Sequence, residues 1–200
     1  MPQIKEIVNS IFTSKTYIII KEREKKAWLV DIGDIEPVVG FLEERHLTLA
    51  GVLITHGHFD HMYGLPSLME RYPDCKVYVS EYGEESLASD RLNMSRYHEM
   101  PVFYAGENIV VVHEGDELVL FDNEPAMRFY ETPGHNQGCL TMILGDLVFT
   151  GDAYIPGIGV NTQVRHSDKE LAIKSMKRIL KLAEGKTILS GHQIENKQSL

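Results

Sequence analysis

The sequence predicts an α/β fold, in which strands and helices alternate along a single domain covering residues 1–200. β-Branched and apolar stretches alternate with segments of helical periodicity, and they form two similar halves. In addition, polar residues of the kinds that bind metal stand where the expected strands end. No internal repeat, low-complexity segment or Gly/Ser/Pro-rich linker divides the chain.

The first half is expected to hold four strands and two helices. The strands are rich in β-branched, aromatic or apolar residues, and they cover residues 16–20, 27–30, 49–55 and 76–80. The helices cover residues 36–45 and 64–71. Asp34 can cap the first turn of the first helix, and Val38, Leu42 and Arg45 share one of its faces.

The second half begins after a less regular stretch, residues 81–108, for which no structure is predicted. Strand-like stretches with intervening Gly, Asp and Asn turn signals cover residues 109–112, 117–121, 127–131, 140–144, 147–150 and 187–190. The clearest helix covers residues 169–183. Ser167 and Glu170 form a capping box before it, and Gly185 stands where a C-terminal cap belongs.

The composition narrows the class of protein. The chain has 200 residues, 43% of them hydrophobic, which is enough for a sizeable core. Its formal charge of -9 disfavours a nucleic-acid partner. No export signal opens the chain, no apolar run approaches the ~20 residues of a membrane span, and Cys75 and Cys139 lack metal-type spacing. We therefore expect a soluble, cytoplasmic protein without a nucleic-acid or membrane partner.

A cluster of potential metal ligands follows the strand expected at residues 49–55. His56, His58, Asp60 and His61 place three imidazoles and one carboxylate within six residues. Such nitrogen and oxygen donors suit zinc, iron and manganese, and the lack of clustered thiolates argues against a structural zinc site. Donors spaced by two converge on an extended backbone, but His61 would then point away. Two metal ions, each taking part of the cluster, resolve this most simply.

Motifs spread along almost the whole chain resemble those of the metallo-β-lactamase superfamily. These motifs are Asp31 with Gly33, Thr55 to His61, Thr132-Pro133-Gly134-His135, Phe149-Thr150-Gly151-Asp152 and Ser190-Gly191-His192. Members of that family fold as a four-layer αββα sandwich, with the metal site at the edge shared by its two sheets. The resemblance implies the same architecture for this chain.

The resemblance also implies a site for two divalent ions. The implied ligands are His56, His58 and His135 for one ion, and Asp60, His61 and His192 for the other. Asp152 would bridge them, since a carboxylate has two oxygens to share between metals about 3.5–4 Å apart. We expect zinc, with iron and manganese as the alternatives, because all three metals accept these ligands. Asp31 is expected to support the ligands rather than to bind metal.

The chemistry expected from such a site is the hydrolysis of a small-molecule acyl substrate. A water between two divalent cations has its pKa lowered from 15.7 toward ~7, so a bridging hydroxide becomes available. Asp60 is the candidate to accept or relay a proton, and Tyr154 to donate a hydrogen bond to the oxyanion. Within the family the chain most resembles the glyoxalase II (hydroxyacylglutathione hydrolase)-like group, which implies a thioester or a related ester or lactone.

Other members of the family leave alternatives open. Glyoxalase II has a C-terminal helical domain that contacts glutathione; none is expected here, because the chain stops eight residues after His192, so glutathione recognition is undecided. Gly138-Cys139 favours a mononuclear iron oxidoreductase resembling persulfide dioxygenase. The acidic composition disfavours a nuclease, and the lack of an export signal disfavours a secreted β-lactamase.

The irregular stretch carries a second feature, a set of adaptable apolar and aromatic side chains. They are Met94, Tyr97, His98, Met100, Phe103 and Tyr104. This segment is a candidate roof for the substrate pocket, and the alternative is ordinary packing of a loop against the core. Four histidines outside the motifs are given no role in the site, namely His46, His98, His113 and His166.

Overall fold

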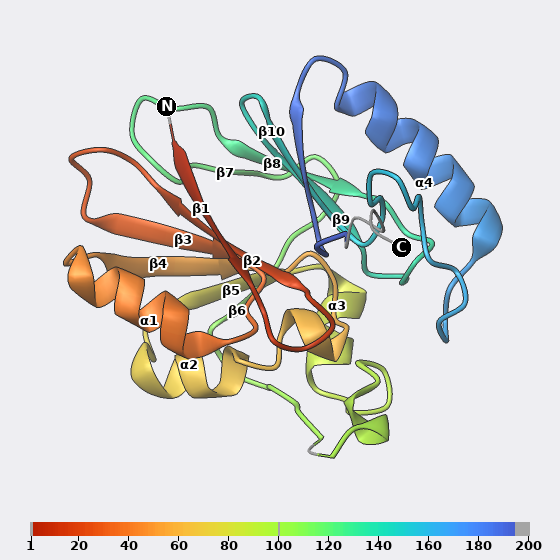
Figure 1. The fold of residues 1–200 in the computed structure, drawn as a ribbon, viewed down its shortest axis with the longest axis horizontal. Coiled ribbons are helices and arrows are strands. Elements are labelled where there is room, and N and C mark those ends of the chain that lie inside the picture. Colours follow the sequence, from red (N-terminus) through yellow and green to blue (C-terminus); the bar gives the residue numbers. More distant parts are fainter. Residues whose placement is uncertain (1, 100, 195–200) are drawn as a thin grey trace, which may run out of the picture.

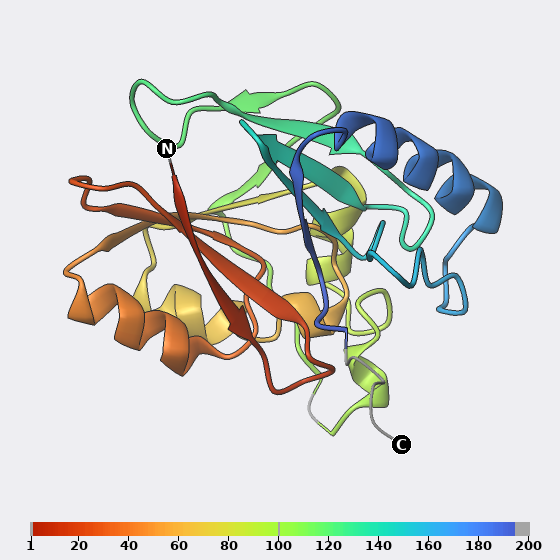
Figure 2. The same ribbon diagram turned by 45° about the horizontal axis from the view of Figure 1, so that its top comes forward.

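Two mixed β-sheets lie face to face, and helices cover their outer faces (Figures 1 and 2). The computed structural model describes residues 2–99 and 101–194. Helices α1 (Ile35–Glu44) and α2 (Leu65–Arg71) lie on the outer side of the first sheet, and α4 (Lys169–Leu182) lies on that of the second. The αββα sandwich expected from the sequence is thereby confirmed.

The first sheet has six strands in sequence order. They are β1 (Gln3–Val8), β2 (Lys15–Ile20), β3 (Lys26–Val30), β4 (Thr48–Leu53), β5 (Lys76–Val79) and β6 (Ile109–Val111). The first three pair antiparallel, whereas β3 to β6 pair parallel. The carboxyl ends of β3 and β4 therefore meet at one edge, where the motifs with Asp31 and His56 follow them.

The second sheet has five strands in the order β11-β10-β9-β8-β7. Their bounds are β7 (Glu117–Leu118), β8 (Met127–Glu131), β9 (Leu140–Leu144), β10 (Leu147–Gly151) and β11 (Thr187–Ser190). Only β10 and β11 pair parallel, so the loops after both strands leave the sheet at the same edge. Asp152 and His192 lie in those loops.

The core is divided by the sheets into layers, as the alternation of side chains along a strand requires. Ile18 of β2 packs with Leu42 of α1 and Leu68 of α2, on the helix side of the first sheet. Its neighbour Ile19 points the other way and packs with Phe129 and the rest of the cluster between the two sheets. One face of each sheet thus packs against the other sheet. This packing holds the two sheets in place at the edge where the loops that carry the metal-binding motifs meet.

Both expected helix caps differ in detail. Asp168, not Ser167, caps α4, and its carboxylate accepts hydrogen bonds from the backbone N–H groups of Glu170 and Leu171. Asp34 stands at the N-cap of α1, but its carboxylate makes no cap hydrogen bond and instead accepts from Ser10 in the turn after β1. Neither expected side chain is free to cap its helix, because Ser10 engages Asp34 and the Ser167 hydroxyl donates to the carbonyls of Thr162 and Val164.

Several elements differ from the sequence-based expectation. The strand β1 and the short helix α3 (Glu81–Leu87) were not expected; Ser80 caps α3 by accepting from Gly83 N–H. The strand expected at 117–121 ends at Leu118, because Leu120 leaves the ladder and its carbonyl accepts from Trp28 Nε1 at 3.1 Å. Among the described residues, no helix has the length and apolarity to cross a membrane.

Candidate metal centre

The structure brings together all seven side chains expected to bind metal. They are His56, His58, Asp60, His61, His135, Asp152 and His192, and they form groups whose donor atoms lie within 4.8 Å of one another. All of them stand in loops that follow β4, β8, β10 and β11. A 3-10 turn over Phe59–His61 reverses the chain after His58, so His61 points into the site instead of away from it.

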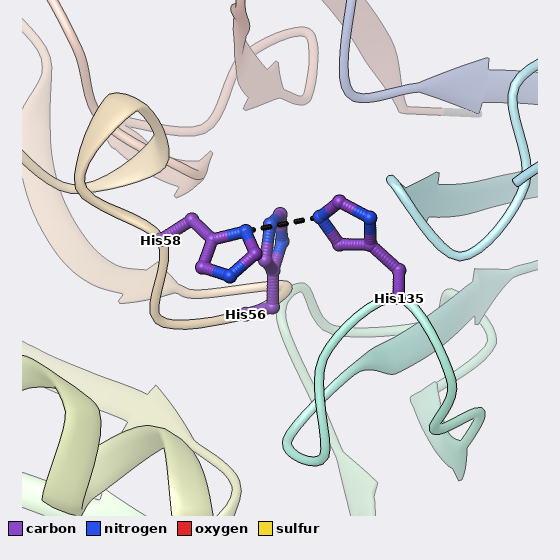
Figure 3. Close-up of side chains that lie close together, drawn as sticks. All are labelled: His56, His58 and His135. Atoms are coloured by element: carbon purple, nitrogen blue, oxygen red, sulfur yellow. Dashed lines mark hydrogen bonds between the residues drawn. The ribbon is translucent and has the colours of Figure 1, made fainter. Parts of the chain in front are cut away.

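The first group consists of His56, His58 and His135. Figure 3 shows the three rings turned toward a common centre, two from the loop after β4 and one from the loop after β8. His58 Nδ1 and His135 Nε2 are 2.9 Å apart. His56 Nε2 is buried and makes no hydrogen bond. Three ring nitrogens therefore converge, and one of them has a lone pair with no partner in the protein.

The second group consists of Asp60, His61 and His192. The Nε2 atoms of the two imidazoles are 3.2 Å apart. Asp60 Oδ2 lies 3.5 Å from His61 Nε2 and 3.3 Å from His192 Nε2. Here a carboxylate and two ring nitrogens from both sheets face one another.

Asp152 lies between the two groups. Its Oδ1 is 3.5 Å from His61 Nε2, and its Oδ2 is 3.5 Å from His135 Nε2 and 3.2 Å from His192 Nε2. Oδ1 is buried and makes no hydrogen bond. The carboxylate thus faces members of both groups, which is the arrangement that a bridging ligand needs.

A buried carboxylate, Asp31, orients one imidazole of each group. Its Oδ2 accepts from His61 Nδ1 at 2.8 Å and from the Thr55 hydroxyl at 2.8 Å. Since the Thr55 hydroxyl has one proton and gives it to Asp31, its oxygen must accept from His56 Nδ1, 3.1 Å away. In its neutral form, each of these two imidazoles then carries its proton on Nδ1 and turns its Nε2 lone pair toward the centre.

Backbone carbonyls fix two further imidazoles in the same way. His135 Nδ1 donates to Asn161 O and His192 Nδ1 donates to Phe12 O, each at 2.8 Å. A carbonyl oxygen can only accept, so in each neutral ring Nε2 is left as the free lone pair. Neither Asn161 nor Phe12 could be identified from the sequence, because each contributes only a backbone oxygen to the site.

The two groups differ in their proton affinity. Burial, with the neighbouring imidazoles, lowers the pKa of His56 well below its usual value and that of His58 to about 3. Burial also opposes the charging of His61 and His192, but the carboxylates of Asp60 and Asp152 outweigh it. They raise the pKa of His61 to about 9 and that of His192 to about 11.

The residues fit divalent cations. A buried nitrogen and a buried carboxylate oxygen without hydrogen bonds, in His56 and Asp152, are costly unless a cation satisfies them. The raised pKa values of His61 and His192 express the same excess of negative charge. Imidazole nitrogen and carboxylate oxygen are donors that zinc, iron and manganese accept.

A cavity of about 390 Å³ opens in front of the metal-type side chains. Met94 and His98, from the segment expected to roof the pocket, line it. Tyr97 and Phe103 of that segment are exposed, Tyr104 packs against the core, and Met100 lies outside the described residues. Two of the side chains expected in the roof, Met94 and His98, therefore reach the cavity.

Tyr154, expected near the reacting atoms, is not among the side chains that line this cavity. It packs against a small apolar cluster that contains Cys139, Ala153 and Ile179 of α4. The chain turns after Asp152, so a residue two positions later faces α4 rather than the site. Asp60, the other residue expected to take part in catalysis, lines the cavity directly.

Known proteins resemble this chain along most of its length. A family model described as the metallo-beta-lactamase superfamily matches residues 13–192. Hydroxyacylglutathione hydrolase 1 of Vibrio vulnificus (strain YJ016) is 30% identical over 161 residues, which are 80% of this chain and 56% of that protein. The chain thus spans about half the length of the curated relatives it matches.

Solved structures share the fold. The B3 metallo-beta-lactamase BLEG-1 has a TM-score of 0.84 and 25% identity, covering 96% of this chain and 92% of that one. ETHE1 from Myxococcus xanthus has a TM-score of 0.78 and 26% identity, covering 98% and 77%. With the sandwich architecture and the five imidazoles and two carboxylates at its edge, these matches lead to one conclusion: the chain belongs to the metallo-β-lactamase superfamily.

Proposed function

We propose that the protein is a metal-dependent hydrolase that cleaves a thioester or a related ester or lactone. The observation that carries this proposal is the pair of donor groups that meet at Asp152. Its relatives named hydroxyacylglutathione hydrolase support a thioester among the acyl substrates. We propose two ions, zinc before iron or manganese, held by the seven side chains described above.

Bound divalent cations supply an acidified water and a positive charge beside the substrate carbonyl. Asp60 lies at the cavity wall, and although burial opposes its ionisation, the charges of His61 and His192 lower its pKa. It is therefore ionised at neutral pH and can take the proton of the attacking water. The water oxygen bonds to the acyl carbon, the carbon–sulfur bond breaks, and the departing thiolate receives the proton that Asp60 took from the water.

Features outside the site support our proposals on cellular compartment, domain organisation and substrate class. The thiols of Cys75 and Cys139 are free and buried, which supports our proposal that the protein works in a reducing compartment such as the cytoplasm. Core clusters connect residues from Ile7 to Ile179, which supports a single domain. The acidic composition supports a small-molecule substrate rather than a nucleic acid.

A second candidate function is a mononuclear iron oxidoreductase resembling persulfide dioxygenase. The likeness to ETHE1 favours it. The complete second group, with Asp60, His61 and His192, favours the hydrolase. Cys139 does not add to the oxidoreductase case, because burial raises the pKa of its thiol and keeps it as an unreactive core residue.

Elemental analysis of protein purified without added metal, followed by activity assays, separates the two. We expect close to two ions per chain and hydrolysis of at least one member of a panel of thioesters, esters and lactones, lost after chelation. Asp152→Ala should abolish both metal binding and hydrolysis, whereas His113→Ala, at an exposed histidine, should change neither. One iron per chain with oxygen uptake on glutathione persulfide, and no hydrolysis, would overturn the proposal.

A further inference from the structure

Outside the metal-binding side chains, most residues that line the cavity in front of the metal centre are aromatic or apolar. Besides the metal-type side chains, the cavity of about 390 Å³ is lined by Phe12, Phe59, Met94, His98, Asn161 and Val164. A pocket of this size suits a small organic molecule. Its lining therefore indicates which chemical group is bound beside the reacting carbonyl.

Three of these side chains form a continuous aromatic wall, which we define as Phe12, Phe59 and His98. The Phe59 and His98 rings stack at 4.0 Å between centroids with an interplanar angle of 33°. Phe12 stands edge-on to both, at 5.8 Å from Phe59 and 5.5 Å from His98. Such packing holds the rings in fixed positions, so the wall can bind a flat group without rearranging.

Phe12 stands at the mouth of the cavity although both its exposure to solvent and its backbone conformation are unfavourable. Its side chain is 59% exposed, and its φ of 52° is in the left-handed region that bulky residues avoid. The hydrogen bond from His192 Nδ1 to Phe12 O fixes the backbone there. A strained, exposed phenylalanine that contacts both the cavity and a metal-type histidine indicates a role in binding.

Apart from the imidazoles and ions of the proposed metal centre, no cationic side chain lines the cavity among the described residues. The lining includes no lysine or arginine, and its two carboxylates, Asp60 and Asp152, belong to the proposed metal site. Arg165, next to the lining residue Val164, lies over the ring of Tyr97 at 5.4 Å. A substrate with free carboxylates, such as a glutathione conjugate, finds no lysine or arginine in these walls to pair with.

We propose that the substrate carries an uncharged aromatic group beside its scissile carbonyl, which packs against the aromatic wall, in preference to an anionic glutathione conjugate. This inference rests on the proposed hydrolase function and names its substrate class. The wall would recognise this group through ring-on-ring contact and burial of its apolar surface. The bond that breaks in the reaction is the carbon–sulfur bond of the thioester, as in the proposed hydrolysis.

Two matched substrate pairs test the inference on the zinc-loaded protein. The first compares phenylacetyl with acetyl thioesters of the same uncharged thiol, N-acetylcysteamine. The second compares the phenylacetyl thioester of that thiol with the phenylacetyl thioester of glutathione. We expect kcat/KM to be higher by about tenfold or more for the aromatic acyl group, and higher for the uncharged thiol than for glutathione, as one desolvated ring contact and apolar burial would give.

Phe12→Leu is the informative variant, because it keeps an apolar side chain and the backbone carbonyl that holds His192. It should retain its metal content and lose most of the aromatic preference. Phe103→Leu, at a side chain that is 63% exposed and outside the cavity lining, should behave as the unchanged protein. His98→Ala provides a second test of the wall should Phe12→Leu fail to fold.

A binding measurement distinguishes this inference from the hydrolase proposal. The probe is a non-hydrolysable thioether, S-(2-phenylethyl)-N-acetylcysteamine, titrated calorimetrically into the zinc-loaded protein. If it binds, and binding weakens in Phe12→Leu or His98→Ala but not in Phe103→Leu, the aromatic subsite stands even without any hydrolysis. Equal rates for the acetyl and phenylacetyl thioesters, a preference for glutathione, or thioether binding that ignores both wall variants would overturn it.

Discussion

Asp31→Asn exchanges one oxygen for an amide nitrogen and should weaken both metal-binding groups. Asp31 Oδ1 accepts from the backbone N–H of Thr55 at 2.7 Å, so the amide oxygen of the variant must stay there. The NH₂ group then takes the place of Oδ2, 2.8 Å from His61 Nδ1 and 2.8 Å from the Thr55 hydroxyl. This NH₂ group donates hydrogen bonds to His61 Nδ1 and to the Thr55 oxygen, whereas the carboxylate oxygen accepted hydrogen bonds from both groups.

The consequence is an inverted tautomer in each group. His61 Nδ1 becomes an acceptor, so its proton moves to Nε2 and removes the lone pair that faces the second group. The Thr55 hydroxyl turns its proton toward His56 Nδ1, 3.1 Å away, with the same result for the first group. Loss of such an orienting contact costs 10–100-fold in metal affinity, about 1.4–2.7 kcal/mol, and we expect this at each of the two sites.

Calorimetric titration of the chelated protein with zinc, analysed for two sites, measures these losses. Thr55→Val removes only the link to His56 and should weaken only one site. Asp34→Asn is the matched control, since its carboxylate accepts from Ser10 and from Tyr63 at 2.5 Å and touches none of the metal-type histidines. Two unchanged zinc affinities in Asp31→Asn would refute the tautomer argument.

Three further outcomes follow from the same geometry. The pKa of His61 is raised to about 9 and that of His192 to about 11, so both rings are protonated at pH 7.5 in the metal-free protein. Binding of a metal ion to the second group should therefore release protons, and the affinity for that ion should increase as the pH rises toward 9. Calorimetry in buffers of different ionisation enthalpy measures the protons released, and equal release for both ions would contradict this expectation. Gly191→Ala should lower metal content, since an added Cβ would lie 2.3 Å from Asp152 Oδ1, whereas Gly40→Ala, with open space around it, should leave metal content unchanged. Tyr154→Phe should alter kcat by less than twofold, because this ring packs in an apolar cluster away from the cavity; a larger fall at constant metal content would restore it to the mechanism.

The α/β class and the cluster from His56 to His61 could be predicted from the residues themselves, whereas the sandwich and the ligands His135, Asp152 and His192 were predicted from the family resemblance of the motifs. Metal-type residues leave a local pattern, such as His56 and His58 after an apolar strand, and α4 leaves a helical period with a cap signal. Edge elements leave weaker patterns. β1 was missed because only Ile7 of its six residues is buried. α3 was missed because its buried face holds Gly83 and Ser86, so that only Leu87 marks an apolar side.

The direction in which individual side chains point, and whether they reach the cavity, could not be predicted from the sequence, because both depend on atoms far apart in the chain. Tyr154 is two residues from Asp152, yet the turn between them carries its ring toward α4. Phe12 has no signal at all, since its role depends on a carbonyl oxygen and a left-handed φ. His98 is an isolated histidine in sequence, and only the fold stacks it on Phe59 at the cavity.

The way in which the site is divided between the sheets links its chemistry to the fold. Each donor group combines side chains from the loops after β4, in the first sheet, with one from the loops after β8 or β11, in the second. Neither sheet alone can supply three converging donors, so the groups exist only when the two apolar faces pack. Because Asp31 follows β3 and orients a histidine of each group, a shift of that strand would disturb both groups together. The position of the first sheet against the second is therefore what sets the geometry available for catalysis.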